Sequence, residues 1–354
     1  MAFSHVCPAA LETADRPAWL ALRRDGIGGS DIAAILGLDT DRHGRPRRTA
    51  WQVYLDKTGA LPDTDPDGRL EELLWWGHEI EPVAAKRFRQ KNPGVRLARM
   101  GMVARTGEPW MRANIDRRVY GCPDGPCGWE CKNRTAWAAQ EWDLGGNPEQ
   151  VPDGPAAQCH WGMIVTGWRH WHLSALIGGN ELRSYRIDAD DELHATMTEE
   201  AAWFWHDHVE PRVPPPIDAS ELTGRILARM WDADPGLVKT ATGEVLGQAR
   251  AYYAAVEAAN RAILLARGRE HELQAWLGDA EIAMHPVTGK PVFTWKRNGT
   301  FAGARFRQEQ PAAVVAAFTR KADAIDTGLM KDKDPELYRA YRARKFLMGK
   351  LPEE

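Results

Sequence analysis

The order in which helix-type and strand-type patterns follow one another is the feature that most constrains this chain. Between residues 70 and 89, apolar side chains recur every three or four positions, which predicts an amphipathic helix. Residues 95–120 alternate apolar and polar side chains, and 128–132 continues this strand pattern after a turn rich in Gly and Pro. A helix over about 155–165 and a strand hairpin over 171–187 follow. This order predicts an α/β (α+β) core with a central mixed sheet flanked by helices.

A proline-rich stretch directly after residue 210 predicts the end of this core. We therefore expect one domain over 1–212 and a mainly helical extension over 213–354. Within the extension, 219–279 is rich in Ala and Leu and predicts two antiparallel helices. A short β pair of 281–296 with 301–308 is expected after them. Oligomer, DNA or partner contacts are the roles we predict for this region.

Four side chains within the core form a pattern suited to phosphodiester cleavage. Glu130 and Lys132 lie two apart on one predicted strand, so both project from one face while Cys131 points to the other. Asp116 lies on the preceding strand, where a hairpin would set it opposite Glu130. Glu81, on the amphipathic helix, can supply a further carboxylate. Carboxylates hold Mg²⁺ in proteins, and a lysine beside them suits the orientation of an attacking water.

An E-x-K triplet alone is weak evidence, because a surface ion pair on a strand explains most of them. The order of helix acid, strand acid and strand E-x-K discriminates better. Asp124, which follows Pro123, is a rival for the strand acid. It lies in a Cys-Pro-Asp-Gly-Pro turn only six residues before Glu130, which would place it at a hairpin tip. We prefer Asp116, whose neighbours fit a strand.

Several motifs occur in a fixed order between about residues 20 and 187. They are GIGGSDIAAILG at 26–37, GHEIEP at 77–82, ANID at 113–116, WECKN at 129–133, Gln158 with Met163, Val165, Thr166 and Gly167, and LIGGN at 176–180. In this order they resemble the YqaJ-like viral recombinases, relatives of lambda exonuclease within the PD-(D/E)xK nucleases. One departure is Asn114-Ile115, where many relatives have a small residue and a proline.

The resemblance implies a restriction-endonuclease-like fold and a metal site. Asp116 and Glu130, together with the backbone carbonyl of Cys131, would bind the catalytic Mg²⁺, for which Mn²⁺ is a possible substitute. Glu81 would help to hold a second ion.

The resemblance also implies roles for residues around that metal. Lys132 would position the attacking water, and Gln158 would assist at the same site. Arg24 and Ser30 would bind a phosphate, in particular the 5′ phosphate of the digested strand. The glycine-bordered helix start at Ser30 suits this role, because such ends bind anions. For Arg24, a solvent-facing helix residue is the alternative.

By the same resemblance, the chain would be a magnesium-dependent exonuclease that digests linear double-stranded DNA from 5′ to 3′. It would leave 3′ overhangs for a single-strand annealing protein in phage-type recombination and would form a homo-oligomer, specifically a trimer. A nicking or restriction-like endonuclease with the same metal site is the first alternative. A catalytically inactive DNA-binding module is the second, which the presence of every acid and the lysine disfavours.

The formal net charge of −3 shows that any DNA-binding basic surface must be local. A solvated face is the alternative explanation for basic runs of this kind. The two candidate runs are Arg42, Arg45, Arg47 and Arg48, and a carboxy-terminal series of Lys331, Lys333, Arg339, Arg342, Arg344, Lys345 and Lys350.

No stretch approaches the roughly 18 uncharged apolar residues that a membrane span requires. The amino terminus lacks the layout of a secretory signal, so we expect a cytoplasmic protein of a bacterium or a phage-infected host. The five cysteines are then expected to be thiols. Cysteine spacings around the site do not match the usual zinc motifs, which disfavours a cysteine-bound metal. We interpret His160, His170 and His172 as structural histidines.

Overall fold

The computed structural model divides the chain into two compact units, Met1–Ala233 and Asp234–Glu354. The structure describes residues 2–41, 43–61, 69–142, 151–231 and 236–295, with short pieces at 308–309, 311–313 and 332–333.

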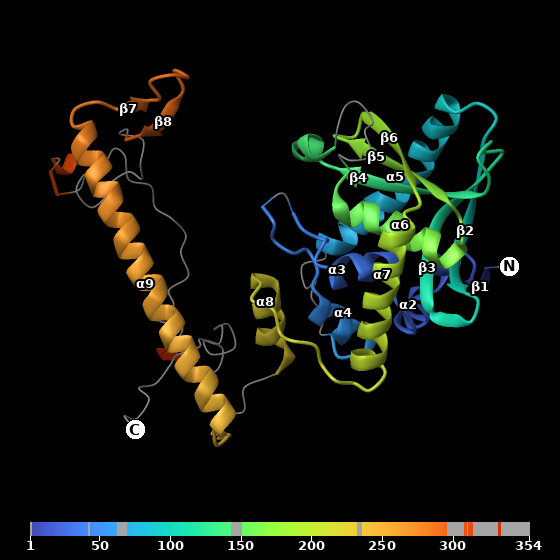
Figure 1. Cartoon of the computed structure of the whole chain (residues 1–354), viewed down its shortest axis with the longest axis horizontal. Helices are drawn as coiled ribbons and strands as arrows, with labels where there is room; N and C mark the ends of the chain where they lie inside the picture. Colours follow the sequence, from blue (N-terminus) through green and yellow to red (C-terminus); the bar gives the residue numbers. More distant parts are fainter. Residues whose placement is uncertain are drawn as a thin grey trace. The chain divides into compact units, whose positions relative to one another are not determined.

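A six-stranded sheet forms the centre of the first unit, with its strands in the order in which they occur along the chain (Figure 1). All neighbouring strands are antiparallel except β4 and β5, which are parallel. This mixed sheet and its flanking helices confirm the predicted fold class. The strands are β1 (Phe3–Cys7), β2 (Arg96–Arg105), β3 (Glu108–Tyr120), β4 (Cys127–Arg134), β5 (His170–Ile177) and β6 (Glu181–Asp188).

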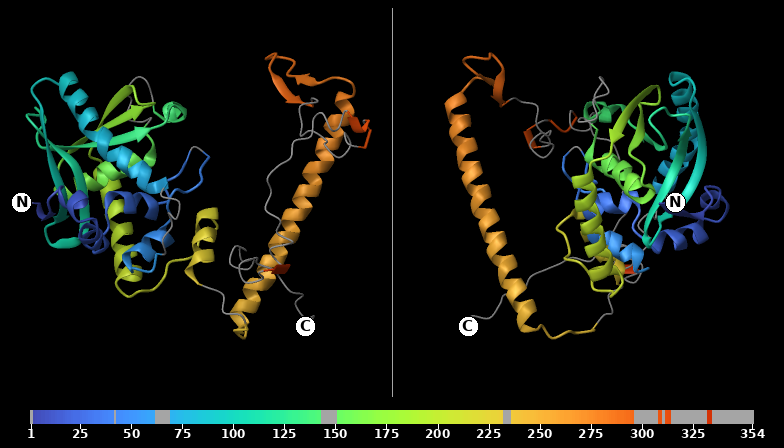
Figure 2. Two further views of the ribbon diagram at one scale, coloured as in Figure 1. Left: turned by 180° about the vertical axis from the view of Figure 1, so that it is seen from behind. Right: turned by 45° about the vertical axis from the view of Figure 1, so that its right-hand side comes forward.

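Helices cover both faces of the sheet, and Figure 2 shows the same layers from behind. On one face lies α5, whose Phe88 packs with Trp129 of β4 in a separate apolar cluster. On the other face, α6 and its neighbour α3 pack into the main core, to which Trp171 of β5 belongs. The remaining helical bounds are α1 (Leu11–Ala14), α2 (Arg16–Arg24), α3 (Gly29–Ile35), α4 (Ala50–Lys57), α5 (Arg69–Lys91), η1 (Ala136–Glu141), α6 (Asp153–Thr166), α7 (Asp191–Phe204), the π-helical η3 (Trp205–Val209) and α8 (Glu221–Met230).

The side chains of β4 and β5 alternate between these two faces. Cys127 and Trp129 face α5, and the Trp129 indole N–H donates to Ser174 Oγ on β5 at 2.9 Å. Gly128 lies between them and pairs with Trp171. A Cβ at Gly128 would lie 2.1 Å from the Trp171 ring, so only glycine leaves room for the indole there.

The first unit runs to Ala233, whereas the sequence led us to expect a boundary after residue 212. The reason is α8, in which Ile226 is buried in the main core. Its start is also fixed, because Asp218 accepts hydrogen bonds from Thr223 and from the Ser220 N–H. The proline-rich stretch therefore lies inside this unit.

The second unit contains one long helix, α9 (Gly243–Leu277), and a small hairpin of β7 (Ile282–Met284) with β8 (Pro291–Thr294). Two helices form within 219–279. They are α8, which belongs to the first unit, and α9, which is continuous over 35 residues. The β pair forms within 281–296. Its predicted partner 301–308 lies almost wholly outside the described residues, as does the carboxy-terminal basic series. Within the described part of the chain, no helix has the length and apolar content to cross a membrane.

Replacement of Gly128 by alanine should destabilise the first unit by about 1–3 kcal/mol, because the added methyl group overpacks the Trp171 ring. Urea denaturation followed by tryptophan fluorescence measures the change. Gly224→Ala in α8 is the matched control, since a Cβ there meets nothing within 4 Å. Equal stability of the two variants would contradict this account of the β4–β5 contact.

Candidate active site

Asp116 and Glu130 come together where β3 and β4 separate. The last paired residues of the two strands are Arg117 and Trp129, so Asp116 and Glu130 lie one step beyond the ladder on facing strands. Asp116 Oδ2 accepts a hydrogen bond of 3.0 Å from the Cys131 N–H, which bridges the gap. The two carboxylates therefore approach each other at the edge where the pairing ends.

Two further acids act electrostatically on Asp116. Burial raises the pKa of Asp116 well above its ordinary value, and the carboxylates of Glu130 and Glu81 raise it further. Among the described residues, however, the only ligand set of three or more groups whose atoms all lie within 4.8 Å of one another is elsewhere. The acids thus form an electrostatic cluster rather than a closed set of metal ligands.

Glu81 of α5 forms an ion pair with Arg117 of β3, in which Oε1 and a guanidinium nitrogen are 2.8 Å apart. Burial raises the pKa of Glu81, and Arg117 opposes this shift. The sequence analysis missed Arg117, because nothing in the strand pattern distinguishes it from a solvated arginine. In the structure it holds Glu81 next to the other acids.

Lys132 lies beside Glu130 on the face of β4 opposite to α5. Its Nζ is 2.6 Å from Glu130 Oε1, and the two side chains are only 18% and 15% exposed. Burial alone would lower the pKa of Lys132, but Glu130 and Asp116 outweigh it and raise that pKa above its ordinary value. Lys132 is therefore an ammonium group held at the cluster of acids.

A cleft of about 510 Å³ opens beside Lys132. Gln158 of α6 lines it, and its buried Oε1 has no hydrogen-bond partner among the described residues. Trp137, 79% exposed on η1, forms part of the wall. Three arginines and three acids, Asp39, Asp41 and Glu141, also line it, and repulsion from Arg47 adds to burial in lowering the pKa of Arg134. The cleft combines an unsatisfied amide oxygen, an exposed indole and cationic side chains: Arg45, Arg47, Lys132 and Arg134.

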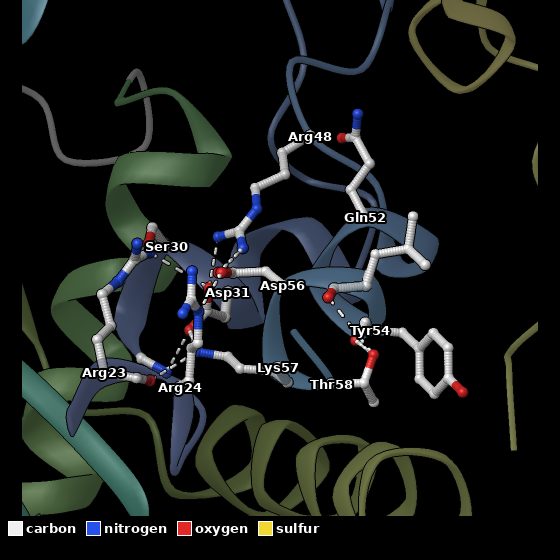
Figure 3. Close-up of polar contacts among 12 residues, drawn as sticks. Arg23, Arg24, Ser30, Asp31, Arg48, Gln52, Tyr54, Asp56, Lys57 and Thr58 are labelled. Atoms are coloured by element: carbon white, nitrogen blue, oxygen red, sulfur yellow. Dashed lines mark hydrogen bonds and ion pairs between the residues drawn. The ribbon is translucent and has the colours of Figure 1, made fainter. Parts of the chain in front are cut away.

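Arg24 and Ser30 do not contact each other in the structure (Figure 3). Ser30 Oγ accepts a hydrogen bond of 2.8 Å from Arg23. Arg24 instead lies 3.5 Å from Asp56, and its side chain is 47% exposed. The predicted partners Arg24 and Ser30 therefore belong to one network of charged side chains without a direct bond between them. Arg23, which binds Ser30, was not predicted from the sequence.

Asp31 is the centre of that network and is fully buried. Its carboxylate accepts a hydrogen bond of 2.8 Å from the Gly28 backbone N–H. It also forms ion pairs with Lys57 at 2.7 Å, with Arg23 at 3.3 Å and with Arg48. Burial would raise the pKa of Asp31, but the three cations outweigh it and hold this pKa far below its ordinary value. Four cations, including Arg24, share two carboxylates here, which leaves an excess of positive charge.

The rival acid Asp124 lies in the turn between β3 and β4, outside the cluster. It is exposed and forms an ion pair with Arg186 of β6.

Residues 18–169 match the family model of the YqaJ-like viral recombinase domain. We call this matched region, which is similar to that family, the recombinase domain. Over 219 residues it is 30% identical to "Uncharacterized protein YqaJ" of Bacillus subtilis (strain 168), which covers 61% of this chain and 63%, less than two thirds, of that protein. Each predicted site residue lies inside the recombinase domain.

Two solved structures of one enzyme are similar to this chain. The alkaline exonuclease (LHK-Exo) from Laribacter hongkongensis has a TM-score of 0.42 and 18% identity, with 60% of this chain and 99% of that chain covered. LHK-Exo in complex with dAMP has a TM-score of 0.42 and 19% identity, with 55% and 93% covered. The family assignment of the recombinase domain rests on the sequence match.

Asp31→Asn should destabilise the recombinase domain by about 3–5 kcal/mol, because it leaves three buried or half-buried cations without their shared partner. The pKa of Asp31 is depressed in the folded state, so the unfolded chain takes up its proton first as the pH falls. The stability that Asp31 contributes is therefore present above a pH of about 3.9 and declines below it.

Denaturation midpoints from pH 7 to pH 3 test this account. The wild-type chain should lose stability more steeply toward pH 3 than Asp31→Asn does. Asp207→Asn, which alters an exposed carboxylate in the same unit, is the control and should follow the wild type. Parallel pH profiles for the wild type and Asp31→Asn would contradict the assignment.

Proposed function

We propose that the recombinase domain is a metal-dependent nuclease that digests linear double-stranded DNA. The observation that carries the proposal is that Asp116 and Glu130 lie one step beyond the β3–β4 ladder on facing strands, with Lys132 Nζ 2.6 Å from Glu130 Oε1 and Glu81 near enough to act electrostatically on Asp116. Beside this edge lies a cleft lined by Lys132 and three arginines, which can contact a phosphate backbone, together with three acids. Neither feature would be needed for a purely structural domain.

The donor set fits a hard divalent cation such as Mg²⁺, with Mn²⁺ as a substitute. Asp116, Glu130 and the backbone carbonyl of Cys131 offer oxygen atoms, which Mg²⁺ prefers. Burial and, to a smaller extent, the neighbouring acids raise the pKa of Asp116, and a cation at this place would offset both effects. When bound, such an ion supplies electrostatic stabilisation of the charge that develops on the scissile phosphate. Glu81 would hold a second ion in competition with Arg117.

The remaining side chains of the site position reactants. Lys132, as an ammonium fixed 2.6 Å from Glu130, can donate to an attacking water and keep it oriented. Gln158 offers a free acceptor, its Oε1, to the same space. Trp137 can stack on an unpaired base at the end of a duplex. Together they describe a site that binds a phosphodiester and aligns a water molecule with it.

The finer mode of action that we propose is exonucleolytic, from 5′ to 3′, with 3′ overhangs left for an annealing protein during phage-type recombination. The surplus of positive charge around Arg23, Arg24 and Arg48 supports a place for a terminal 5′ phosphate. A homo-oligomer, specifically a trimer, and action in the cytoplasm belong to the same proposal. A nicking or restriction-like endonuclease is the alternative mode.

Glu130→Ala and Lys132→Ala should each lower the release of nucleotides from linear duplex DNA in Mg²⁺ by at least about 100-fold, because each removes a group that holds or aligns the reactants. Asp124→Ala, which removes the rival carboxylate in the turn, is the matched control and should stay within a few-fold of wild type. Circular dichroism establishes that the variants fold. If the substituted proteins digest DNA as fast as the parent, the site is misassigned.

A covalently closed circular duplex should resist digestion under conditions that degrade the same DNA after linearisation. Among linear substrates, a 5′-phosphorylated end should be digested faster than a 5′-hydroxyl end. Arg24→Ala should reduce that preference, because it removes positive charge from the predicted phosphate site. Gel electrophoresis of end-labelled duplexes measures both effects. Nicking of the circle would favour the endonuclease instead.

A further inference from the structure

Two cysteines and two histidines meet on the α5 side of the sheet, in a group that the proposed nuclease mechanism does not use. They are Cys122 and Cys127, which flank the turn between β3 and β4, and His170 and His172 of β5. Each offers one ligand atom, and the four atoms all lie within 4.8 Å of one another. The sequence analysis interpreted the cysteines as plain thiols and the histidines as structural, and did not connect them.

The topology explains why these four residues converge. Cys127 is the first residue of β4, and Cys122 lies across the Cys-Pro-Asp-Gly-Pro-Cys turn from it. The parallel register pairs Gly128 with Trp171, so His170 and His172 flank this level of the sheet. Because strand side chains alternate, both histidines point to the face that Cys127 occupies, and Trp171 points to the other.

The distances within the group are those of side chains directed at a common centre. Cys122 Sγ lies 3.3 Å from His170 Nε2 and 3.9 Å from His172 Nε2. Cys127 and His170 are buried, while Cys122 and His172 are half-buried. Phe88 of α5 packs against the His172 ring at a centroid distance of 5.4 Å. The group is therefore enclosed and preorganised by the packing around it.

We propose that these four side chains bind a structural zinc ion. Two thiolates and two imidazoles are the donor set of many structural zinc sites, and four protein ligands leave no open position for catalysis. Tetrahedral coordination with ordinary Zn–S and Zn–N bonds sets the ligand atoms about 3.3–3.8 Å apart, close to the separations seen here. A two-iron cluster would fit less well, because its histidines and cysteines bind different irons and lie farther apart.

A zinc ion at this position would fix the β3–β4 turn relative to β5. The β3–β4 ladder joins only three residues of each strand before the strands separate at Asp116 and Glu130. A zinc ion at the other end of this ladder would tie the β3–β4 turn to β5. It would thereby hold the two strands that carry the acids in a fixed relation. Soft sulfur and nitrogen ligands also separate this site chemically from the oxygen-rich cluster of acids.

Metal analysis of the full chain, purified without chelators, tests the proposal. Elemental mass spectrometry should find about one zinc per chain. Cys122→Ser and His172→Ala should lower that content at least about fivefold, whereas Cys7→Ser, which changes a buried thiol outside the group, should retain it. Glu130→Ala should also retain zinc, which distinguishes this site from the acid cluster.

His172→Cys is the control for misfolding of His172→Ala, since a thiolate can replace the imidazole as a ligand. The His172→Cys variant should bind zinc again. When Co²⁺ replaces the zinc, the wild type should show the visible absorption of tetrahedral sulfur and nitrogen coordination, and the absorption of His172→Cys should be shifted from it. Three results would overturn the proposal. They are iron with acid-labile sulfide, a disulfide between Cys122 and Cys127, and equal zinc content in Cys122→Ser and the wild type.

Discussion

The short pairing of β3 with β4 is the constraint on which the candidate active site depends. Because hydrogen bonds between the two strands stop at Arg117 and Trp129, the next residues on each strand are free to face a common space. The Asp116 carboxylate accepts a hydrogen bond from the Cys131 N–H, in place of a further backbone hydrogen bond between the two strands. A longer ladder would occupy the backbone groups that the proposed metal site requires.

Two carboxylates of the recombinase domain, the buried Asp31 and the half-buried Asp116, have different kinds of partner. Asp31 meets three cations, which keep it ionised and turn it into a structural link between α2, α3 and α4. Asp116 meets other acids, which favour its neutral form in the absence of a cation. The first arrangement stabilises the fold by itself, whereas the second becomes favourable only with a positive ligand.

Sequence reasoning predicted the parts of the site that depend on local pattern. Strand alternation and hairpin order were sufficient to bring Asp116, Glu130 and Lys132 together, because these residues lie within two adjacent strands. It did not predict Arg117 as the partner of Glu81, since that contact depends on how α5 crosses the sheet. Nor did it predict that α8 belongs to the first unit, since that depends on the burial of Ile226 in a core whose other members lie far away in the sequence.

The cysteine–histidine group shows why such a site escapes a search by spacing. Cys122 is 48 and 50 residues from the two histidines, and the cysteines and histidines meet only through the parallel register of β4 with β5. That register depends in turn on Gly128, which leaves room for Trp171 on the opposite face. Alternate residues of β4 therefore serve two different chemistries. Cys127 and Trp129 fix the strand against α5 and β5, while Glu130 and Lys132 lie on the opposite face, so the face of the proposed active site is packed from behind.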